Sequence, residues 1–312
     1  MNITGILTKT QIPKPILKWV GGKTQILDKL LIEFPLYINN YHELFLGGGS
    51  VLITLLSYIK AGTVRLDGKI YAYDLNEPLI YVYKNIQVNP QELYDEIQKL
   101  ISGMNLCIGC FVNRKPNTIE EASTSKESYY YWIRSQYNNL TSDEKKGIIG
   151  SSMFIFLNKT CFRGIFRVGP NGYNVPFGHN KNPEIINIEH LLEIHQLIQN
   201  VIFESCDFEA SIIKADEGDL IYMDPPYAPE TKNSFVGYTA NGFRVEQHQA
   251  LFNICNTLKE KKIKMLMSNS DVDLVRNHFS IDKYSVTSIL CKRLINSKKP
   301  DSKISEVIIK NY

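Results

Sequence analysis

The clearest chemistry in the sequence lies where a strand-like run, residues 219–223, stops at Asp224 and is followed by Pro225, Pro226 and Tyr227. Two prolines cannot continue a hydrogen-bonded strand, so they leave a carboxylate, unpaired carbonyls and an aromatic face at the strand's carboxyl end. An exocyclic amine fits this set, because the Asp224 carboxylate and the Pro225 carbonyl can accept its two hydrogens while Tyr227 stacks on the ring. The alternative is a plain turn that ends a strand.

A second candidate site follows another strand-like run, where Phe45, Gly47 and Gly49 lead into a helical segment. Glycines at the start of a helix let the backbone approach a nucleotide closely. Asp74 ends the next predicted strand, and an acid at a strand end about 25 residues beyond the glycines can bind both ribose hydroxyls. The spacing differs from the dinucleotide Gly-x-Gly-x-x-Gly fingerprint. It favours an adenosyl ligand without a pyrophosphate over a simple helix cap.

These residues need a scaffold, and the apolar pattern predicts an open α/β sheet in which most strands are parallel. Nearly continuous apolar runs are typical of buried strands. We expect strands at residues 41–46, 69–74, 201–205, 219–224, 262–268, 284–290 and 304–311. We expect helices between them at residues 51–60, 78–87, 191–199, 246–260 and 272–279. Ligands of such sheets bind at the carboxyl edge, which is where both candidate sites lie.

This alternation of strands and helices stops between residues 89 and 186, which predicts a mainly helical domain inserted into a discontinuous sheet domain, residues 1–88 and 187–312. We expect helices of the insertion at residues 90–101, 128–140 and 143–159, and then a hairpin loop at residues 160–182. The polar stretch 106–126 is expected to be an exposed loop, and we assign it no function.

The composition is that of an ordinary folded protein. The chain has 312 residues, of which 44% are hydrophobic and 21% are charged, so it is long enough for one large or two modest domains with a real core. It has no apolar run of the roughly 20 residues that span a bilayer, and its start has no signal architecture. Six scattered cysteines suit a reducing compartment. We therefore expect an intracellular protein with no membrane association.

The net charge of +3 hides three stretches that contain cations and no carboxylates, at residues 1–27, 145–183 and 283–300. If these stretches converge in space, they form a basic face suited to a polyanion. The alternative is three separate solvated loops.

The turn at residues 224–227 and the Phe-x-Gly-x-Gly segment are together the paired signature of amino-methyltransferases that use S-adenosylmethionine. More closely, the chain resembles the Dam-type DNA adenine-N6 methyltransferases of the class alpha order. Segments that match this family are Leu17-Lys-Trp-Val-Gly-Gly-Lys23, Glu43-Leu-Phe-Leu-Gly-Gly-Gly-Ser-Val51, Asp74-Leu-Asn76, Asn174-Val-Pro-Phe-Gly178 and Met267-Ser-Asn269. The resemblance implies a Rossmann-like S-adenosylmethionine-dependent methyltransferase sheet with an inserted, mainly helical target-recognition domain.

The resemblance also implies the residues of the catalytic site. The cofactor would contact Trp19, Lys23, Asp74 and Asp224, in a cradle made by Phe45, Gly47 and Gly49. Residues 224–227 would hold a target adenine that is flipped out of duplex DNA. The methyl group would then pass directly to N6 and leave S-adenosylhomocysteine, so we expect neither a metal nor a covalent intermediate.

For DNA reading, the resemblance points to the expected hairpin loop. The position of Arg167 reads guanine in the family, Ile165 and Pro176 match positions that touch neighbouring bases, and Lys18 matches a lysine on the other guanine of the site. Arg163 belongs to the same basic, aromatic segment. Many relatives have Asn-Gly-Leu-x-Arg where this chain has Arg-Gly-Ile-Phe-Arg at residues 163–167. This departure falls where the DNA site is decided, and GATC is our first expectation. Nonspecific binding of phosphates by these cations is the alternative.

Other interpretations remain open. The Asp-Pro-Pro-Tyr turn also serves enzymes that methylate cytosine N4, RNA or a glutamine side chain, and a non-catalytic DNA-binding relative is a further alternative. We expect a monomer that binds double-stranded DNA in the cytoplasm or nucleoid, and a cognate restriction endonuclease acting on the same site as a further partner. Cys107 and Cys110 are expected to lie in a bare loop without a metal, and His190 and His195 to be structural.

Overall fold

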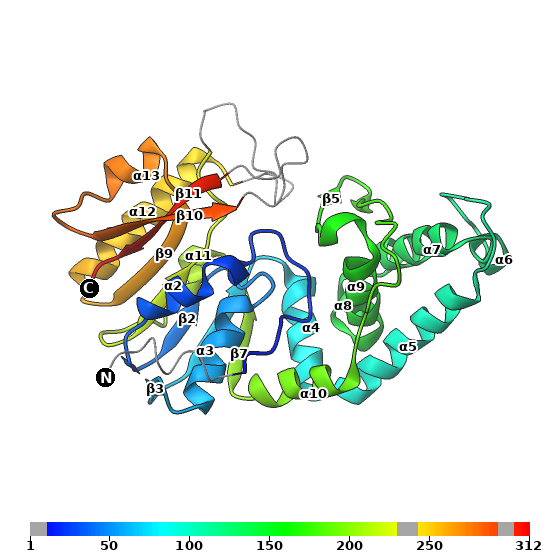
Figure 1. The fold of residues 1–312 in the computed structure, drawn as a ribbon, viewed down its shortest axis with the longest axis horizontal. Helices are drawn as coiled ribbons and strands as arrows, with labels where there is room; N and C mark the ends of the chain where they lie inside the picture. The colour runs from blue at the N-terminus through cyan, green and yellow to red at the C-terminus, as the bar shows by residue number, and fades with distance from the viewer. Residues whose placement is uncertain (1–10, 230–242, 293–302) are drawn as a thin grey trace.

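The structure is a computed structural model that describes residues 11–229, 243–292 and 303–312. Its main features are a sheet part, which carries the C-terminus, and a helical part beside it (Figure 1). No helix in the described ranges is long and apolar enough to cross a membrane. Of the cation-only stretches predicted above, Lys9, Arg293, Lys298 and Lys299 lie outside the described residues.

Seven strands form the central sheet, in the order β10-β11-β9-β8-β2-β4-β7. Five of these strands are parallel to one another, while β11 runs antiparallel to both of its neighbours. The strands are β2 (Tyr41–Glu43), β4 (Ile70–Asp74), β7 (Val201–Ser205), β8 (Leu220–Met223), β9 (Lys264–Ser270), β10 (Ser285–Lys292) and β11 (Lys303–Lys310). The predicted α/β fold with a mostly parallel sheet is confirmed, and each of the seven expected strands is present.

Hydrophobic clusters cover both faces of this sheet, because successive side chains of a strand point to opposite faces. In β8, Leu220 and Tyr222 join the cluster on one face, whereas Ile221 and Met223 join the cluster on the other. The first face packs against α2 (Leu27–Ile32), α3 (Ser50–Lys60) and α4 (Glu77–Val88). The second face packs against α12 (Val245–Glu260) and α13 (Asp273–His278). A strand buried on both faces therefore reads as a continuous apolar run.

Smaller elements complete the sheet part. They are the 3-10 helix η1 (Lys23–Gln25), the short parallel pair β1 (Tyr37–Ile38) and β3 (Arg65–Leu66), and the helices α10 (Ile188–Leu197) and α11 (Phe208–Ser211). His190 and His195 lie within α10 and donate ring N–H groups to the carbonyls of Lys14 and Ile86, at 2.7 and 2.8 Å. These bonds hold α10 against the N-terminal segment and α4.

The helical part consists of α5 (Pro90–Leu106), α6 (Ile119–Ala122), α7 (Lys126–Asn139), α8 (Ser142–Lys146) and α9 (Ile148–Thr160). After these helices come η2 (Phe162–Gly164) and the antiparallel hairpin β5 (Val168–Gly169) and β6 (Gly172–Tyr173). Both α5 and α4 pack on α9, and the buried side chains of the helical part belong to the same hydrophobic cluster as the first face of the sheet.

The prediction of one helix over residues 143–159 was wrong, because the chain breaks at Gly147. Thr141 starts α8 with a capping box, and Gly147 has the extended angles φ −78° and ψ 178° that end it and begin α9. A Cβ on Gly150 would lie 2.5 Å from the Lys145 backbone. The missing side chain therefore lets α9 turn back closely on α8.

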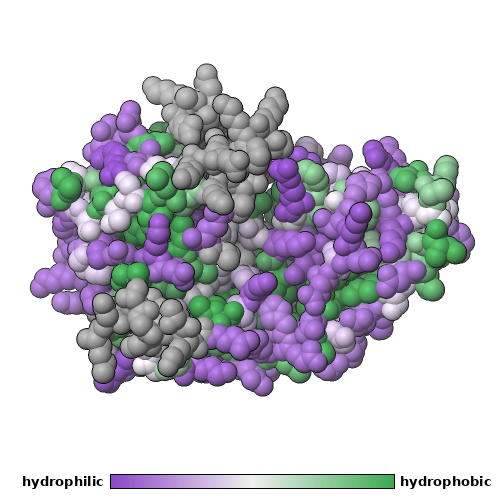
Figure 2. All heavy atoms as spheres, viewed as in Figure 1, coloured by the Kyte–Doolittle hydropathy of each residue, from purple (hydrophilic) through white to green (hydrophobic). Residues whose placement is uncertain are grey.

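The expectation of an irregular, exposed loop over residues 106–126 was only partly right. The Cys107 thiol is buried and donates to the Gly103 carbonyl at 3.2 Å, and Ala122 is fully buried in the short helix α6. Ile108 and Phe111 remain exposed, at 95% and 70%. Hydrophobic residues accordingly gather at the end of the helical part in Figure 2, on a surface that is otherwise largely hydrophilic.

Candidate active site

Asp224 directly follows β8 at the carboxyl edge of the sheet, and its side chain is 19% exposed. Its Oδ1 atom lies 2.7 Å from the Lys23 Nζ atom and accepts a hydrogen bond from Ser268 Oγ at 3.0 Å. Burial raises the pKa of Asp224 above its usual value, and the two bonds partly oppose that rise. The carboxylate is thus held in one place with its charge compensated.

Lys23 belongs to η1 and joins three parts of the site. Its ammonium donates to the Gly21 carbonyl at 2.8 Å and lies 4.6 Å from the centre of the Tyr227 ring. Its backbone N–H donates to Ser50 Oγ, at the start of α3, at 3.3 Å. Only 5% of the Lys23 side chain is exposed, so this ammonium is available to groups inside the site and not to bulk solvent.

Side chains of β9 and β11 fasten the turn that follows Asp224. Asn269 Oδ1 accepts the Ala228 N–H at 3.0 Å, and Ser270 Oγ donates to the Ala228 carbonyl at 2.6 Å. The Tyr227 hydroxyl donates to Glu306 Oε2 at 2.8 Å. Pro225 and Pro226 have no N–H to give to a ladder, so these bonds define the conformation of the turn in place of strand pairing.

The glycine-rich segment after β2 sits beside this turn. Gly47 and Gly49 have φ angles of 49° and 69°, the left-handed region that favours glycine. A Cβ on Gly47 would lie 2.7 Å from the Trp19 ring. A Cβ on Gly49 would lie 2.8 Å from the Tyr83 hydroxyl, a buried oxygen without a hydrogen-bond partner in the described ranges. Space and backbone angles together therefore require glycine at both positions.

Asp74 ends β4 and accepts two backbone N–H groups. Gly47 N–H donates to Oδ2 at 2.9 Å, and Asn76 N–H donates to Oδ1 at 2.8 Å. Burial raises the pKa of Asp74, while both bonds favour the ionised form. Asp74, the acid at the end of β4, is therefore in direct contact with the glycine-rich segment.

An aromatic group borders the glycines. The Phe45 ring centre lies 6.0 Å from that of Phe208 and 6.1 Å from that of Phe243. Our sequence reasoning found Phe45 but missed Phe208 and Phe243. A signal for Phe208 is its place just after a predicted strand, at the edge where ligands of α/β sheets bind.

Glu43 lies buried at the end of β2. The Tyr41 hydroxyl donates to Glu43 Oε2 at 2.8 Å, and burial raises the pKa of Glu43 to about 8. Glu43 is therefore mostly protonated at pH 7.

The predicted DNA-reading residues are mostly exposed and meet the sheet part through Lys18. Asn158, near the end of α9, accepts the Lys18 N–H at 2.9 Å and donates to the Lys18 carbonyl at 2.8 Å. The neighbouring Trp19 stacks on Phe166, with ring centres 5.8 Å apart. Lys18 and Trp19 therefore lie against the segment that carries Arg163, Ile165, Arg167 and Pro176.

Arg167 precedes the β5–β6 hairpin, which lies within residues 160–182. Its guanidinium donates to Asn174 Oδ1 at 2.6 Å and to the Asn174 carbonyl at 3.3 Å. Arg163 and Pro176 are exposed, and Ile165 is half-buried. The exposed Arg167 is thus presented by a fixed hairpin and not by a loose loop.

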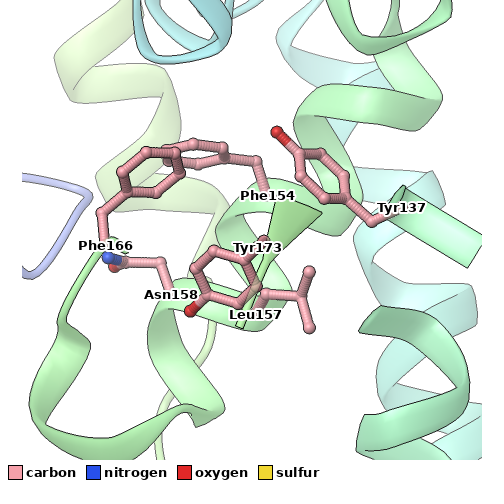
Figure 3. Close-up of a pocket in the computed structure, with 6 residues that line it drawn as sticks. All are labelled: Tyr137, Phe154, Leu157, Asn158, Phe166 and Tyr173. Carbon is pink, nitrogen blue, oxygen red and sulfur yellow. The ribbon is translucent and has the colours of Figure 1, made fainter. Parts of the chain in front are cut away.

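Aromatic packing anchors this hairpin (Figure 3). Phe166 points inward, with its ring centre 5.3 Å from Phe154 and 5.6 Å from Tyr173. The void that these rings surround measures about 10 Å³, close to the volume needed by a single water. It is therefore too small for an organic ligand.

In the part of the chain that the structure describes, no group of three or more His, Cys, Asp or Glu side chains is arranged to bind a metal. Cys110 is exposed, whereas the Cys107 thiol donates a hydrogen bond to the Gly103 carbonyl.

A carboxylate followed by two prolines and a tyrosine, placed beside a glycine cradle on an α/β sheet, defines an amino-methyltransferase. The chain belongs to the D12 class N6 adenine-specific DNA methyltransferase family, whose model matches residues 19–292. The expected likeness to Dam-type enzymes is therefore confirmed, as is the enzyme class.

Relatives cover nearly the whole chain. It is 32% identical over 311 residues to the type II methyltransferase M.MjaIII of Methanocaldococcus jannaschii, across 96% of this chain and 99% of that protein. It is 29% identical to the type II methyltransferase M1.LlaDCHI of Lactococcus lactis, across 98% and 99%. It is 30% identical to the DNA adenine methylase of Haemophilus influenzae, across 93% of this chain and 90% of that protein.

Proposed function

We propose that this protein transfers a methyl group from S-adenosylmethionine to N6 of an adenine in a short double-stranded DNA site, after flipping the base out of the helix. The turn at Asp224 carries the proposal. It offers a carboxylate, the Pro225 carbonyl and the Tyr227 ring at the carboxyl edge of the sheet, which are two acceptors and a stacking face for an adenine amine.

The residues present fit the cofactor. The glycines keep the segment close to the Trp19 ring, which the resemblance assigns to the cofactor, and Asp74 stands at the strand end where ribose hydroxyls bind. Phe45 adds an apolar border. When bound, S-adenosylmethionine supplies an electrophilic methyl group and becomes S-adenosylhomocysteine.

The protein's own contribution is positioning and charge. An adenine inside a duplex cannot reach Asp224, so the base leaves the stack at a cost of a few kcal/mol. Asp224 and the Pro225 carbonyl accept the N6 hydrogens and direct the nitrogen lone pair toward the methyl group, while Tyr227 holds the ring. Lys23 keeps Asp224 ionised in a buried place. No residue of the chain needs to form a covalent bond with the base.

We further propose that two domains of the chain have different functions. Residues 1–88 and 187–312 form a Rossmann-like catalytic domain, and residues 89–186 form a target-recognition domain. The supporting observations are the strand order, with an antiparallel strand between β9 and β10, and the cluster of helices that interrupts the strand–helix alternation.

For recognition, Lys18, Arg163, Ile165, Arg167 and Pro176 contact the DNA, and GATC is the first site to test. An arginine can donate two hydrogen bonds to guanine O6 and N7. The support is the exposure of Arg167 on an anchored hairpin and the closeness of Lys18 to the same segment.

We also propose a monomer that works on DNA inside the cell, in the cytoplasm or nucleoid. Two relatives are named type II methyltransferases, which favours a partner restriction endonuclease acting on the same site. Sedimentation of the purified protein with and without a duplex tests the monomer.

The test of the function is incubation of the purified protein with S-adenosylmethionine and unmethylated genomic DNA, followed by mapping of modified bases. N6-methyladenine confined to one short motif is expected, and the motif decides between GATC and its rivals. Methylated cytosine, or methylation of RNA or protein with none on DNA, would contradict the proposal. Cofactor binding without transfer to any substrate would favour a non-catalytic DNA-binding role.

A further inference from the structure

Glu306 lies 79 residues after Tyr227 in the chain, yet the Tyr227 hydroxyl donates to its Oε2 atom at 2.8 Å. The sheet order makes this contact. Antiparallel β11 lies beside β9 with Glu306 opposite Ser270, and Ser270 itself bonds the turn at Ala228. The strand next to β9 therefore reaches over to the catalytic turn.

Tyr227 needs such a contact because the prolines before it restrict the backbone and not the ring. The ring turns about two side-chain bonds, and Tyr227 is only half-buried. The Lys23 ammonium lies 4.6 Å from the centre of the ring and leaves its hydroxyl end to Glu306. The hydrogen bond to Glu306 holds the hydroxyl end of the ring, so Glu306 can fix the edge of the ring.

The charges favour the same role. Lys23 is paired with Asp224. Burial raises the pKa of the Tyr227 phenol, and the nearby Asp224 and Glu306 carboxylates add to that rise. Tyr227 therefore stays a neutral hydrogen-bond donor at the pH of catalysis. Glu306 touches neither reacting atom in this arrangement and acts through the tyrosine.

We propose that Glu306 is a positioning residue that orients the Tyr227 ring for stacking on the target base. The inference rests on the proposed function, because the stacked base is the adenine of that reaction. It assigns a role to a strand outside the motifs that mark the catalytic site in the sequence.

The experiment compares Glu306→Ala, Glu306→Gln, Tyr227→Phe and the double variant Glu306→Ala with Tyr227→Phe. Glu306→Ala should lower kcat about tenfold, a loss typical of imperfect orientation, with KM for the cofactor nearly unchanged. Glu306→Gln should recover most of kcat, because its amide oxygen still accepts from the phenol. Glu306→Ala should add little to Tyr227→Phe, which already lacks the hydroxyl.

The spectroscopic readout is 2-aminopurine at the target adenine. This base fluoresces when it leaves the duplex stack and is quenched when it stacks on an aromatic ring, so Glu306→Ala should give a brighter complex than the unsubstituted protein. A matched control is Glu33→Ala. Glu33 accepts a hydrogen bond at 2.6 Å from Lys310, which lies on β11 four residues beyond Glu306 and away from the turn. This control should keep kcat and the fluorescence.

A Glu306→Ala variant with the kcat and fluorescence of the unsubstituted protein would overturn the proposal. A double variant whose loss of kcat equals the product of the two single losses would also overturn it. If Glu306→Ala does not fold, Tyr227→Phe decides alone: a kcat equal to that of the unsubstituted protein overturns the role. An unsubstituted protein that methylates no DNA would instead overturn the proposed function itself.

Discussion

The Lys23 ammonium lies 2.7 Å from Asp224 Oδ1. This ion pair joins the segment 17–23 to the end of strand β8. Burial disfavours the charged form of a carboxylate, and a neighbouring cation favours it. The pair therefore lets an aspartate remain an acceptor in a place sheltered from water, which is what holding an amine by its hydrogens requires.

Asp224→Ala should abolish turnover and leave DNA binding largely intact, because in the proposed mechanism the carboxylate contacts the flipped base and not the duplex. Single-turnover methylation and a duplex-binding assay, run on the same preparation, measure the two effects separately. Equal loss of both would count against the role assigned to Asp224.

The acid limb of the pH–activity profile should reflect the protonation of Asp224. Because burial raises its pKa, activity should fall as the pH drops through a range higher than that of an ordinary aspartate. Lys23→Gln removes the cation that opposes this rise, so the acid limb should move to still higher pH. The measurement is kcat/KM against pH for both proteins, and an unmoved limb would refute the coupling.

Glu43 predicts a pH dependence of stability. Its folded pKa of about 8 lies above the unfolded value near 4.5, so the folded state holds more protons and the contribution of Glu43 to stability declines as pH rises from about 4.5 to about 8. Glu43→Gln keeps a neutral acceptor for Tyr41 and should flatten that decline. Thermal unfolding from pH 5 to 9 tests this, and identical slopes for the two proteins would argue against a buried neutral acid.

Gly47→Ala should weaken cofactor binding, because its Cβ would meet the Trp19 ring at 2.7 Å. Gly62→Ala is the matched control: Gly62 has a φ of 69° but open space around its Cβ position. Both variants should lose about 1–2 kcal/mol of stability from the left-handed backbone. Gly47→Ala should lose more because of the Trp19 contact, and only Gly47→Ala should lose affinity. Calorimetric titration with S-adenosylhomocysteine separates the two effects, and equal affinities would show that the cradle is elsewhere.

Arg167→Ala should relax base choice more than it slows methyl transfer. One bidentate arginine contact contributes about 1–3 kcal/mol of discrimination. The check is the rate on the preferred duplex compared with duplexes that carry one substituted base pair. Asn174→Ala should relax the choice less, since it loosens the Arg167 guanidinium without removing it. Unchanged selectivity in Arg167→Ala would assign the reading to another residue.

The residues of the candidate site could be found from the sequence because their signals are local. Prolines after Asp224 end a strand wherever they occur, and Gly47 and Gly49 mark backbone angles that other residues rarely adopt. The seven strands were predictable for a similar reason, since burial on both faces leaves a continuous apolar run. Local patterns failed at Gly147, where the close approach of α9 to α8 decides that one predicted helix becomes two.

The sequence by itself thus determined the fold class, the family and the position of the candidate catalytic turn. Only the tertiary structure decided which distant side chains serve that turn: Lys23 on Asp224, Ser268 beside it, and Glu306 on Tyr227. The reason is physical. Those contacts depend on the order and direction of the strands, and above all on antiparallel β11 lying next to β9, which no short-range pattern of residues specifies.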